Sequence, residues 1–207
     1  MEMTVTEGLV QLKLLDKRID SVTSSSRLVW ATACKGSDTM INGMSRETVE
    51  KNIKSNYDSI CDLIKRRAAI KSAIVKSNAV TNVTIAGETM TVAEAIERKS
   101  SIEYEEDLME SIHRSLMSAT QLMNQKNDIV EENLKSILEK LVSSDKPNMA
   151  KEQTELADAY RTQNKWELVD PLKAEDVVSF MKEKIDSFMA NVDTALSLSN
   201  AVTTIEV

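Results

Sequence analysis

Between Gly87 and Pro147 the chain contains neither glycine nor proline. Over all 207 residues there are four glycines and two prolines, about 3% of the chain, whereas the two together make up ~12% of an ordinary protein. Sandwiches, barrels and propellers need many tight turns, and glycine and proline supply those turns. The shortage therefore argues against these folds and predicts a mainly α protein.

The uninterrupted interval carries a heptad pattern. A Thr91–Glu94 capping box marks its start, and a continuous helix over 92–142 would be ~75 Å long at about 1.5 Å per residue. If this helix breaks, we expect the break at the polar residues 124–128. The apolar seam consists of Met109, Ile112, Leu116, Met123, Val130, Leu134, Ile137 and Leu141, with Ala119 and Lys126 at its two remaining positions.

Other segments also show helical spacing of apolar residues. We expect helices over 6–22 and 45–76, and a short helix over 152–160 followed by extended chain through Trp166. The last helix is expected to start with Asp170 as N-cap and Pro171 at its first position. Its seam is Val178, Met181, Ile185, Phe188, Val192 and Ala195. Residues 27–46 predict an irregular excursion between helices.

The pentapeptide Ser-Asn-Ala-Val-Thr occurs twice, at 77–81 and 199–203, and each copy is followed by β-branched residues. Residues 82–91 predict a β-hairpin with its turn at 86–88. We interpret 204–207 as a third strand on that hairpin, which would bury Ile205 and Val207. The alternative is two similar helix stops that never meet.

Together these patterns predict a mainly α fold. We expect a long antiparallel helical bundle or coiled-coil hairpin with a small sheet of two or three strands at one end. The prediction is a single elongated domain over 1–207 that contains the excursion at 27–46, the hairpin at 82–91 and the third strand at 204–207.

The charge balance and the cysteines limit the classes of function. The formal net charge is −7 and the pI is about 5.0, so we expect no nucleic-acid partner. The basic run 65–67 fits a solvated helix face. Cys34 and Cys61 lack metal-site spacing and are expected to be free thiols in a reducing compartment. No signal peptide and no apolar membrane span are visible.

Few residues could take part in catalysis or metal binding. The single histidine, His113, lies one position off the seam, where a surface role is the default. Acidic residues cluster on the long helix, and we expect solvation rather than acid–base or Mg²⁺ chemistry: Glu103, Glu105, Glu106, Asp107, Glu110, Glu131 and Glu132. No phosphate-binding, dinucleotide-binding or nucleophile-elbow motif is present. We predict no catalytic, cofactor-binding or metal residue, and no enzyme activity.

Residues 63–112 resemble a small helical-hairpin family labelled septicolysin-like. The resemblance is carried by an Asn-containing helix stop, a short hairpin, and re-entry through a Thr-x-x-Glu cap followed by a Glu-Arg pair: Asn78, Thr81, Thr91, Glu94, Glu97 and Arg98. The wider pattern is similar to uncharacterised structural proteins of large tailed phages, and it comprises the excursion at 35–43, the hairpin at 82–91, Asp-Pro-Leu at 170–172 and the closing 199–207. This resemblance implies a virion protein and supplies no catalytic residues.

We therefore expect a non-enzymatic structural or assembly protein, a tailed-phage virion component. It would form homo-oligomers through helix–helix contacts and bind other virion or host proteins, in the virion or the host cytoplasm. One alternative is a cytosolic regulatory module that binds a host factor. The other is a lytic or pore-forming protein, which the family label suggests but no segment of the sequence supports.

Overall fold

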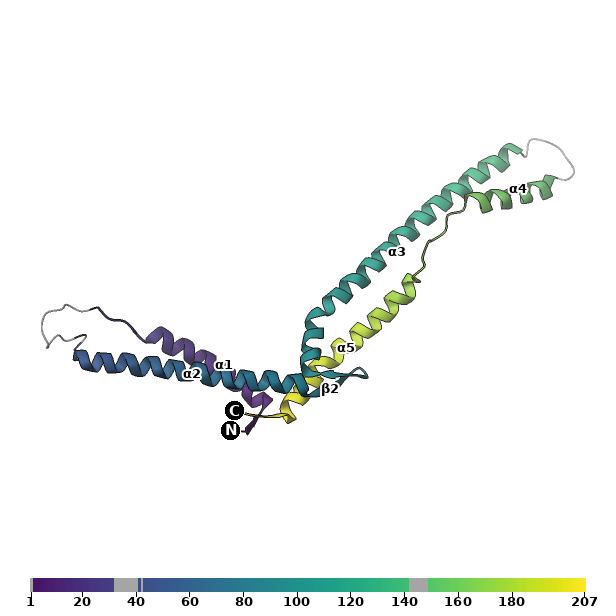
Figure 1. Cartoon of the computed structure of the whole chain (residues 1–207). Coiled ribbons are helices and arrows are strands. Elements are labelled where there is room, and N and C mark those ends of the chain that lie inside the picture. The colour runs from purple at the N-terminus through teal and green to yellow at the C-terminus, as the bar shows by residue number, and fades with distance from the viewer. Residues whose placement is uncertain (1, 32–40, 42, 142–148) are drawn as a thin grey trace. The chain divides into compact units, whose positions relative to one another are not determined.

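The structure is a computed structural model that describes residues 2–31, 41, 43–141 and 149–207. Helices dominate it, which confirms the mainly α fold class (Figure 1). The described chain divides into two compact units. Unit 1 contains residues 1–100 and 188–207, and unit 2 contains residues 101–187. Both boundaries fall inside helices, so no turn or linker in the sequence marks them. Each unit is described by itself.

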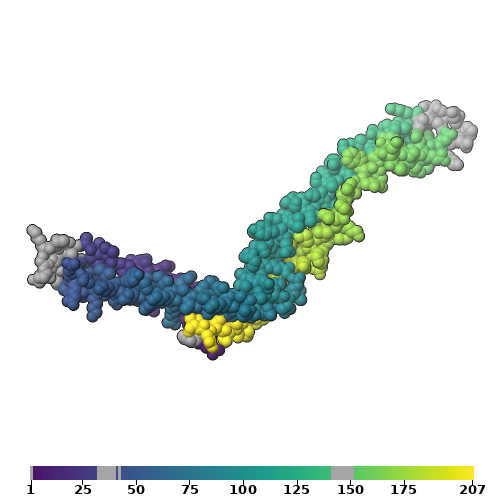
Figure 2. All heavy atoms as spheres, viewed as in Figure 1, coloured from purple at the N-terminus to yellow at the C-terminus, as the bar shows by residue number. Residues whose placement is uncertain are grey.

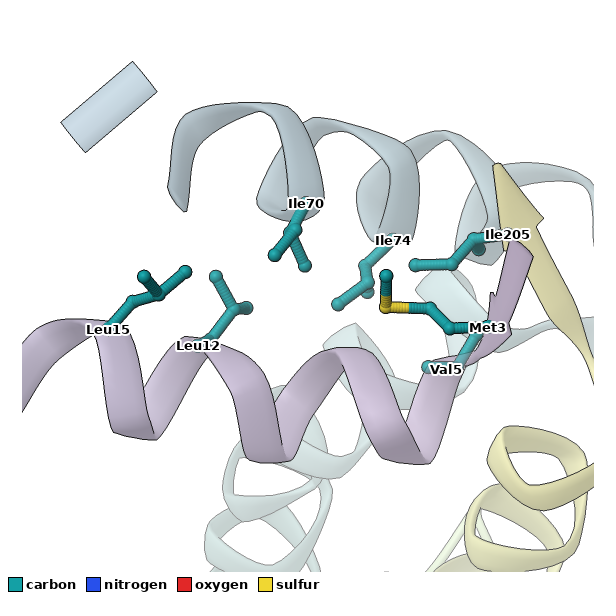
Figure 3. Close-up of a cluster of buried hydrophobic side chains, with 7 residues drawn as sticks. All are labelled: Met3, Val5, Leu12, Leu15, Ile70, Ile74 and Ile205. Carbon is teal, nitrogen blue, oxygen red and sulfur yellow. The ribbon is translucent and has the colours of Figure 1, made fainter. Parts of the chain in front are cut away.

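Unit 1 contains the first two helices, α1 (Val5–Ser25) and α2 (Arg46–Val80), which lie side by side (Figure 1). Gly8 allows their close approach, because a Cβ there would lie 3.2 Å from the side chains of both Ile74 and Ile205. Figure 3 shows the apolar cluster between them: Met3, Val5, Leu12, Leu15, Ile70, Ile74 and Ile205. Leu12 and Leu15 of the predicted helix 6–22 therefore pack against the second half of α2.

Part of the predicted excursion at 27–46 lies outside the described residues, namely 32–40 and 42. Residues 26–31 have no regular secondary structure, and Ile41 and Met44 form an isolated bridge around Gly43, whose φ is +77°. The irregular prediction therefore holds for the flanks that the structure describes.

Two antiparallel strand pairs lie in unit 1. Strands β2 (Asn82–Ile85) and β3 (Glu88–Thr91) form the predicted hairpin, whose turn residues Ala86 and Gly87 both have positive φ. Strand β4 (Thr204–Glu206) does not join this hairpin. It pairs instead with β1 (Glu2–Thr4), a strand that was not predicted from the sequence.

The predicted third strand is therefore wrong in its partner. The main-chain carbonyl of Thr203 accepts a hydrogen bond from the N–H of Val5 at 2.9 Å, which ties the end of the last helix to the start of α1. Ile205 is buried as predicted, against the α1–α2 cluster, but Val207 is 38% exposed. The prediction failed because a strand's partner is set by long-range packing, which a repeated helix stop does not encode.

Helix α3 (Val92–Leu141) runs for 50 residues without interruption, so the polar residues 124–128 do not break it. Among the described side chains its seam positions are partly buried, Leu134 is fully buried and Ala119 is the exposed exception. Helix α4 (Met149–Asn164) extends beyond the predicted 152–160 at both ends.

Helix α5 (Ala174–Val202) begins three residues later than predicted. Asp170 still caps it, because its carboxylate accepts a hydrogen bond from the Ala174 N–H at 2.8 Å. However, Lys173 has a φ of +53°, which ends the preceding turn and places Pro171 outside the helix.

Candidate functional site

The end of α2 and the end of α5 lead into equivalent structures, which we call the closed and the open junction. The closed junction comprises residues 77–94. The open junction comprises residues 199–206 and 2–7. Each contains Ser-Asn-Ala-Val-Thr at the helix end and Met-Thr-Val-x-Glu, at 90–94 or 3–7, at the start of the next helix.

The backbone geometry of the two junctions matches in register. Met90 lies opposite Val83, and Met3 lies opposite Ile205. The Val92 N–H donates to the Thr81 carbonyl at 2.8 Å, as that of Val5 does to Thr203. Both helices start with a capping box, in which a threonine hydroxyl accepts from the N–H of the glutamate three residues on, at 3.2 Å in each case. The junctions are thus two copies of one structural motif.

The histidine and the acidic residues that could in principle take part in catalysis or metal binding form no common site in the described part of the chain. His113 is exposed on α3, and Glu110 forms an ion pair with Arg114 at 3.2 Å. Glu131 accepts two hydrogen bonds from Arg161 of α4, at 2.8 and 2.9 Å, and these hold the pKa of Glu131 below its ordinary value. Among the described residues no group of three potential ligands could hold a metal ion. The acidic residues with a described partner thus stabilise helix surfaces.

The basic run 65–67 contributes to helix packing rather than to a solvated face alone. Arg67 forms an ion pair with Asp16, and the hydrogen bond from this pair raises the pKa of Arg67. Arg66 donates to the side-chain oxygen of Gln11 at 3.5 Å. Both contacts join α2 to α1.

Cys61 is a free thiol, as predicted, whereas Cys34 lies outside the described residues. Hydrogen bonding to Cys61 raises the pKa of the neighbouring Tyr57, four residues earlier on the same helix. Within the described part of the chain, no helix combines the length and the apolar character needed to cross a membrane.

Exposed apolar side chains form a row along α3 in unit 2. Tyr104 and Leu108 are four residues apart. Leu122 and Ile129 continue the row two and three heptads after Leu108. These side chains are 71%, 54%, 47% and 47% exposed. Such spacing places them on one stripe of a helix, next to the seam that packs inside the unit. We call these four residues the α3 row.

The helices that pack along α3 in unit 2 are separated by a non-helical segment. Helix α4 ends at Asn164 and α5 begins at Ala174, and the residues between them are not helical (Figure 1). Figure 2 shows the atoms of this part of the chain, in green to yellow-green, against α3 in teal. We call 165–173 the connecting segment. The side chain of Asn127 fixes it by accepting from the Trp166 N–H at 2.8 Å and donating to the Trp166 carbonyl at 3.0 Å. The polar residues 124–128, where we expected a break in α3, instead anchor this segment.

A hollow of about 320 Å³ lies between α3 and the connecting segment. Its α3 wall includes small side chains at intervals of four, namely Ser111, Ser115 and Ala119, and its other wall is formed by Leu168–Leu172. An extended chain is thinner than a helix, so it leaves this space where a continuous helix would fill it. The α3 row and the hollow adjoin, because Ser115 lies midway between Leu108 and Leu122 on the same heptad position.

Neither the open junction nor the hollow was predicted from the sequence. The repeated Met-Thr-Val-x-Glu is visible in the sequence and could have revealed the open junction. The hollow had a weaker signal, the alternation of Trp166, Glu167 and Leu168, which is typical of extended chain. No protein-family model matches the sequence, and comparison with curated proteins and with solved structures finds no match.

Proposed function

We propose that this chain is a non-enzymatic structural or assembly protein that acts by self-association of its helices. The observation that carries the proposal is the α3 row, four large apolar side chains that remain between 47% and 71% exposed on a 50-residue helix. Exposed apolar stripes of this length favour contacts with other chains, because water is excluded when they are covered.

The magnitude of the effect indicates a modest affinity per contact. Burial of a fully exposed large apolar side chain stabilises by ~1.5–3 kcal/mol. The half-exposed rows of two copies therefore supply roughly 6–12 kcal/mol, which is similar to the ~4–15 kcal/mol cost of association. Single contacts of this strength are reversible, and an assembly of many copies becomes stable because the contacts repeat.

The setting we propose is the virion of a tailed phage, with other virion or host proteins as further partners and the host cytoplasm as the site of assembly. The support for this setting is the resemblance of the excursion at 35–43, the hairpin at 82–91, residues 170–172 and the closing 199–207 to structural proteins of such phages. The acidic composition favours protein partners over nucleic acid, because a basic surface is what binds phosphates.

The first test is sedimentation velocity of the full chain over a range of concentrations. We expect reversible oligomers, and we expect the double variant Leu108→Ser/Leu122→Ser to weaken them. Leu14→Ser is the matched control, because Leu14 is 62% exposed on α1 and lies outside the α3 row. A chain that remains monomeric at all practical concentrations would contradict self-association.

The second test is mass spectrometry of purified particles from cells that make the protein during infection. A virion component is expected in the particles at a fixed, high copy number. Absence from particles together with early synthesis would instead favour the regulatory alternative, and release of dye from lipid vesicles would favour the lytic one.

A further inference from the structure

The two junctions divide the chain into halves that begin and end in the same way. The N-terminal half, residues 2–85, starts with β1 and α1 and finishes with α2 and β2. The C-terminal half, residues 88–207, starts with β3 and α3 and finishes with α5 and β4. Strand β2 pairs with β3, and β1 pairs with β4. Each junction therefore takes one strand from each half, and the halves hold each other at two places.

The contacts that join the halves differ from those that hold each half together. Across the halves, the Val5 N–H donates to the Thr203 carbonyl at 2.9 Å, and Ile205 is buried against α1 and α2. Within the N-terminal half α1 packs along α2, and within the C-terminal half an ion pair between Lys99 and Asp193 joins α3 to α5. Separation of the halves therefore leaves the contacts within each helix pair in place.

Ala86 and Gly87 form the only covalent connection between the halves, since both cysteines, Cys34 and Cys61, belong to the N-terminal half. Ala86 has a φ of +50° and Gly87 a φ of +82°. Two-residue turns with positive φ at both positions favour Asn-Gly or Gly-Gly, because an alanine side chain strains the backbone there. Ala86 is also exposed, and apart from chain neighbours no described atom lies within 4 Å of a Cβ built at Gly87. The turn is thus a strained connection with open space around it.

The register of the hairpin allows the turn to become part of a strand. Ile85 lies opposite Glu88, so Ala86 and Gly87 are the next pair in the same register. If the turn opens, residues 82–91 form one continuous strand that can pair antiparallel with the same segment of another chain. The two-fold axis of that pair passes through the former turns, and no residue is left over. Short turns under strain favour such an exchange between chains.

We propose that this chain forms a domain-swapped dimer, in which the turn at 86–87 opens and the N-terminal half of each copy pairs with the C-terminal half of the other. Every contact of the two junctions is then made between chains, with the same residues that make it within one chain. The open junction supports the exchange, because it has the register and the main-chain bond of the closed junction without a covalent turn.

A second copy is the occupant because the surface that it covers is already seen covered by identical residues of the same chain. No new complementarity is needed, and a foreign protein would have to reproduce both strands and both helix ends. The exchanged surface lies in unit 1 and does not include the α3 row. The inference therefore goes beyond the proposed function and names a second, independent route to association.

Two single substitutions at Ala86 test the turn in the full chain. Both variants and a reference with Ala86 carry Leu108→Ser/Leu122→Ser, which weakens contacts through the α3 row. They are refolded from urea over a range of concentrations, because exchange requires the halves to separate. Ala86→Val should favour the dimer, since a β-branched residue resists positive φ and suits a strand. Ala86→Asn should favour the monomer, since Asn-Gly suits the turn.

Light scattering after size-exclusion chromatography gives the dissociation constants of the refolded proteins. We expect the Val and Asn variants to differ by about a hundredfold, tenfold for each of the two turns in a dimer, with the reference between them. Equal constants or the opposite order would overturn the exchange. So would a reference that refolds only to monomer at every concentration.

A cross-linking experiment tests the geometry of the exchange directly. The hydroxyls of Thr84 and Thr89 lie 3.2 Å apart across the hairpin, and both residues are exposed. Thr84→Cys and Thr89→Cys are made in separate chains that also carry Cys34→Ser and Cys61→Ser, and the two proteins are refolded together in a thiol–disulfide buffer. We expect the mixed 84–89 disulfide to dominate in peptide mapping, because these positions face each other only between swapped chains.

The control is the same pair of proteins refolded separately at low concentration and then mixed. Its yield of the mixed disulfide should be much smaller, and an equal yield would overturn the exchange. Dominant 84–84 or 89–89 products, or all three products in random proportions, would overturn it as well.

The outcomes separate this inference from the proposed function. If the folded chain self-associates through the α3 row but refolding gives no 84–89 disulfide, the exchange is wrong and the proposed function stands. If the folded chain is monomeric at all practical concentrations but refolding gives dimers linked through 84–89, the α3 row is not a self-association surface and the exchange stands.

Discussion

The closed and open junctions share a motif but differ in connectivity. In the closed junction, residues 86 and 87 join β2 to β3, whereas in the open junction β4 and β1 come from opposite ends of the described chain. Both nevertheless have the same strand register, the same helix caps and the same main-chain bond from Val5 or Val92. The comparison shows that the helix-stop and helix-start residues are sufficient to set this geometry without a covalent turn.

Side-chain contacts beyond the motif follow the same equivalence. Gln11 and Arg66 contact each other beside the open junction. The residues at the two equivalent positions are Arg98 and Phe188, where the guanidinium lies 4.6 Å from the centre of the ring. The positions are retained while the chemistry of the contact has changed, which indicates that backbone geometry rather than any one interaction defines the junction.

Removal of β4 should produce the largest effect. The 1–202 truncation loses the burial of Ile205, about 1.5–3 kcal/mol, and several hydrogen bonds at about 1 kcal/mol each. We expect thermal unfolding at least ~6 °C lower than in the full chain. An unchanged midpoint, with the amides of 204–206 exchanging freely in the full chain, would show that the open junction contributes no stability.

A smaller effect is expected where the cores of the two junctions differ. Gly8 and Ile205 occupy the places that Ala95 and Val83 occupy in the closed junction, so the side chains of each pair have the same number of carbon atoms. Gly8→Ala alone should cost ~1–3 kcal/mol, because its Cβ would lie 3.2 Å from Ile205 Cδ1. Ile205→Val alone should cost ~0.5–1.5 kcal/mol.

The double variant Gly8→Ala/Ile205→Val should be more stable than the sum of its parts predicts, since valine lacks the Cδ1 atom that the new Cβ meets. Urea denaturation of the four proteins measures this coupling, which we expect to exceed ~0.5 kcal/mol. Strictly additive costs would mean that the two junction cores are not equivalent in packing.

The smallest effect is expected at the exposed strand pair. Glu2 lies opposite Glu206 in the open junction, where the closed junction has Thr89 opposite Thr84 with their hydroxyls 3.2 Å apart. Like charges directly across a strand pair destabilise it, so Glu2→Thr/Glu206→Thr should raise the melting temperature by about 1–3 °C. The reciprocal Thr84→Glu/Thr89→Glu should lower it, and equal signs for the two exchanges would contradict the account.

The features that were predicted correctly from the sequence are those that depend on local residue patterns. The seam of α3 and the 82–91 hairpin follow from residue spacing. The repeated Ser-Asn-Ala-Val-Thr does end α2 and α5, but α2 runs to Val80, beyond the predicted end at residue 76. The partner of β4 was not predicted, because strand pairing across the whole chain depends on tertiary packing around Gly8. The start of α5 also differed from the predicted one, because lysine at position 173 gives no indication of a positive φ.

The hollow could not be located from the sequence for a related reason. Its existence depends on the connecting segment staying extended against α3, and that in turn depends on two hydrogen bonds between Asn127 and Trp166, residues 39 positions apart. The polar residues 124–128 alone do not indicate which distant part of the chain they will bind.

A circular permutant tests the equivalence of the junctions most directly. Val207 is joined to Met1 through Ala-Gly, the two residues that close the 82–91 hairpin, and the chain is reopened by removing Ala86 and Gly87, so that it starts at Glu88 and ends at Ile85. A permutant opened between Glu110 and Ser111, inside α3, is the control. We predict that the first permutant keeps its helical circular dichroism, melts within about 5 °C of the natural chain and protects the amides of both strand pairs from exchange, while the control is strongly destabilised. If the two-residue link prevents folding, or if 204–206 lose protection when so joined, the open junction is not a copy of the closed one.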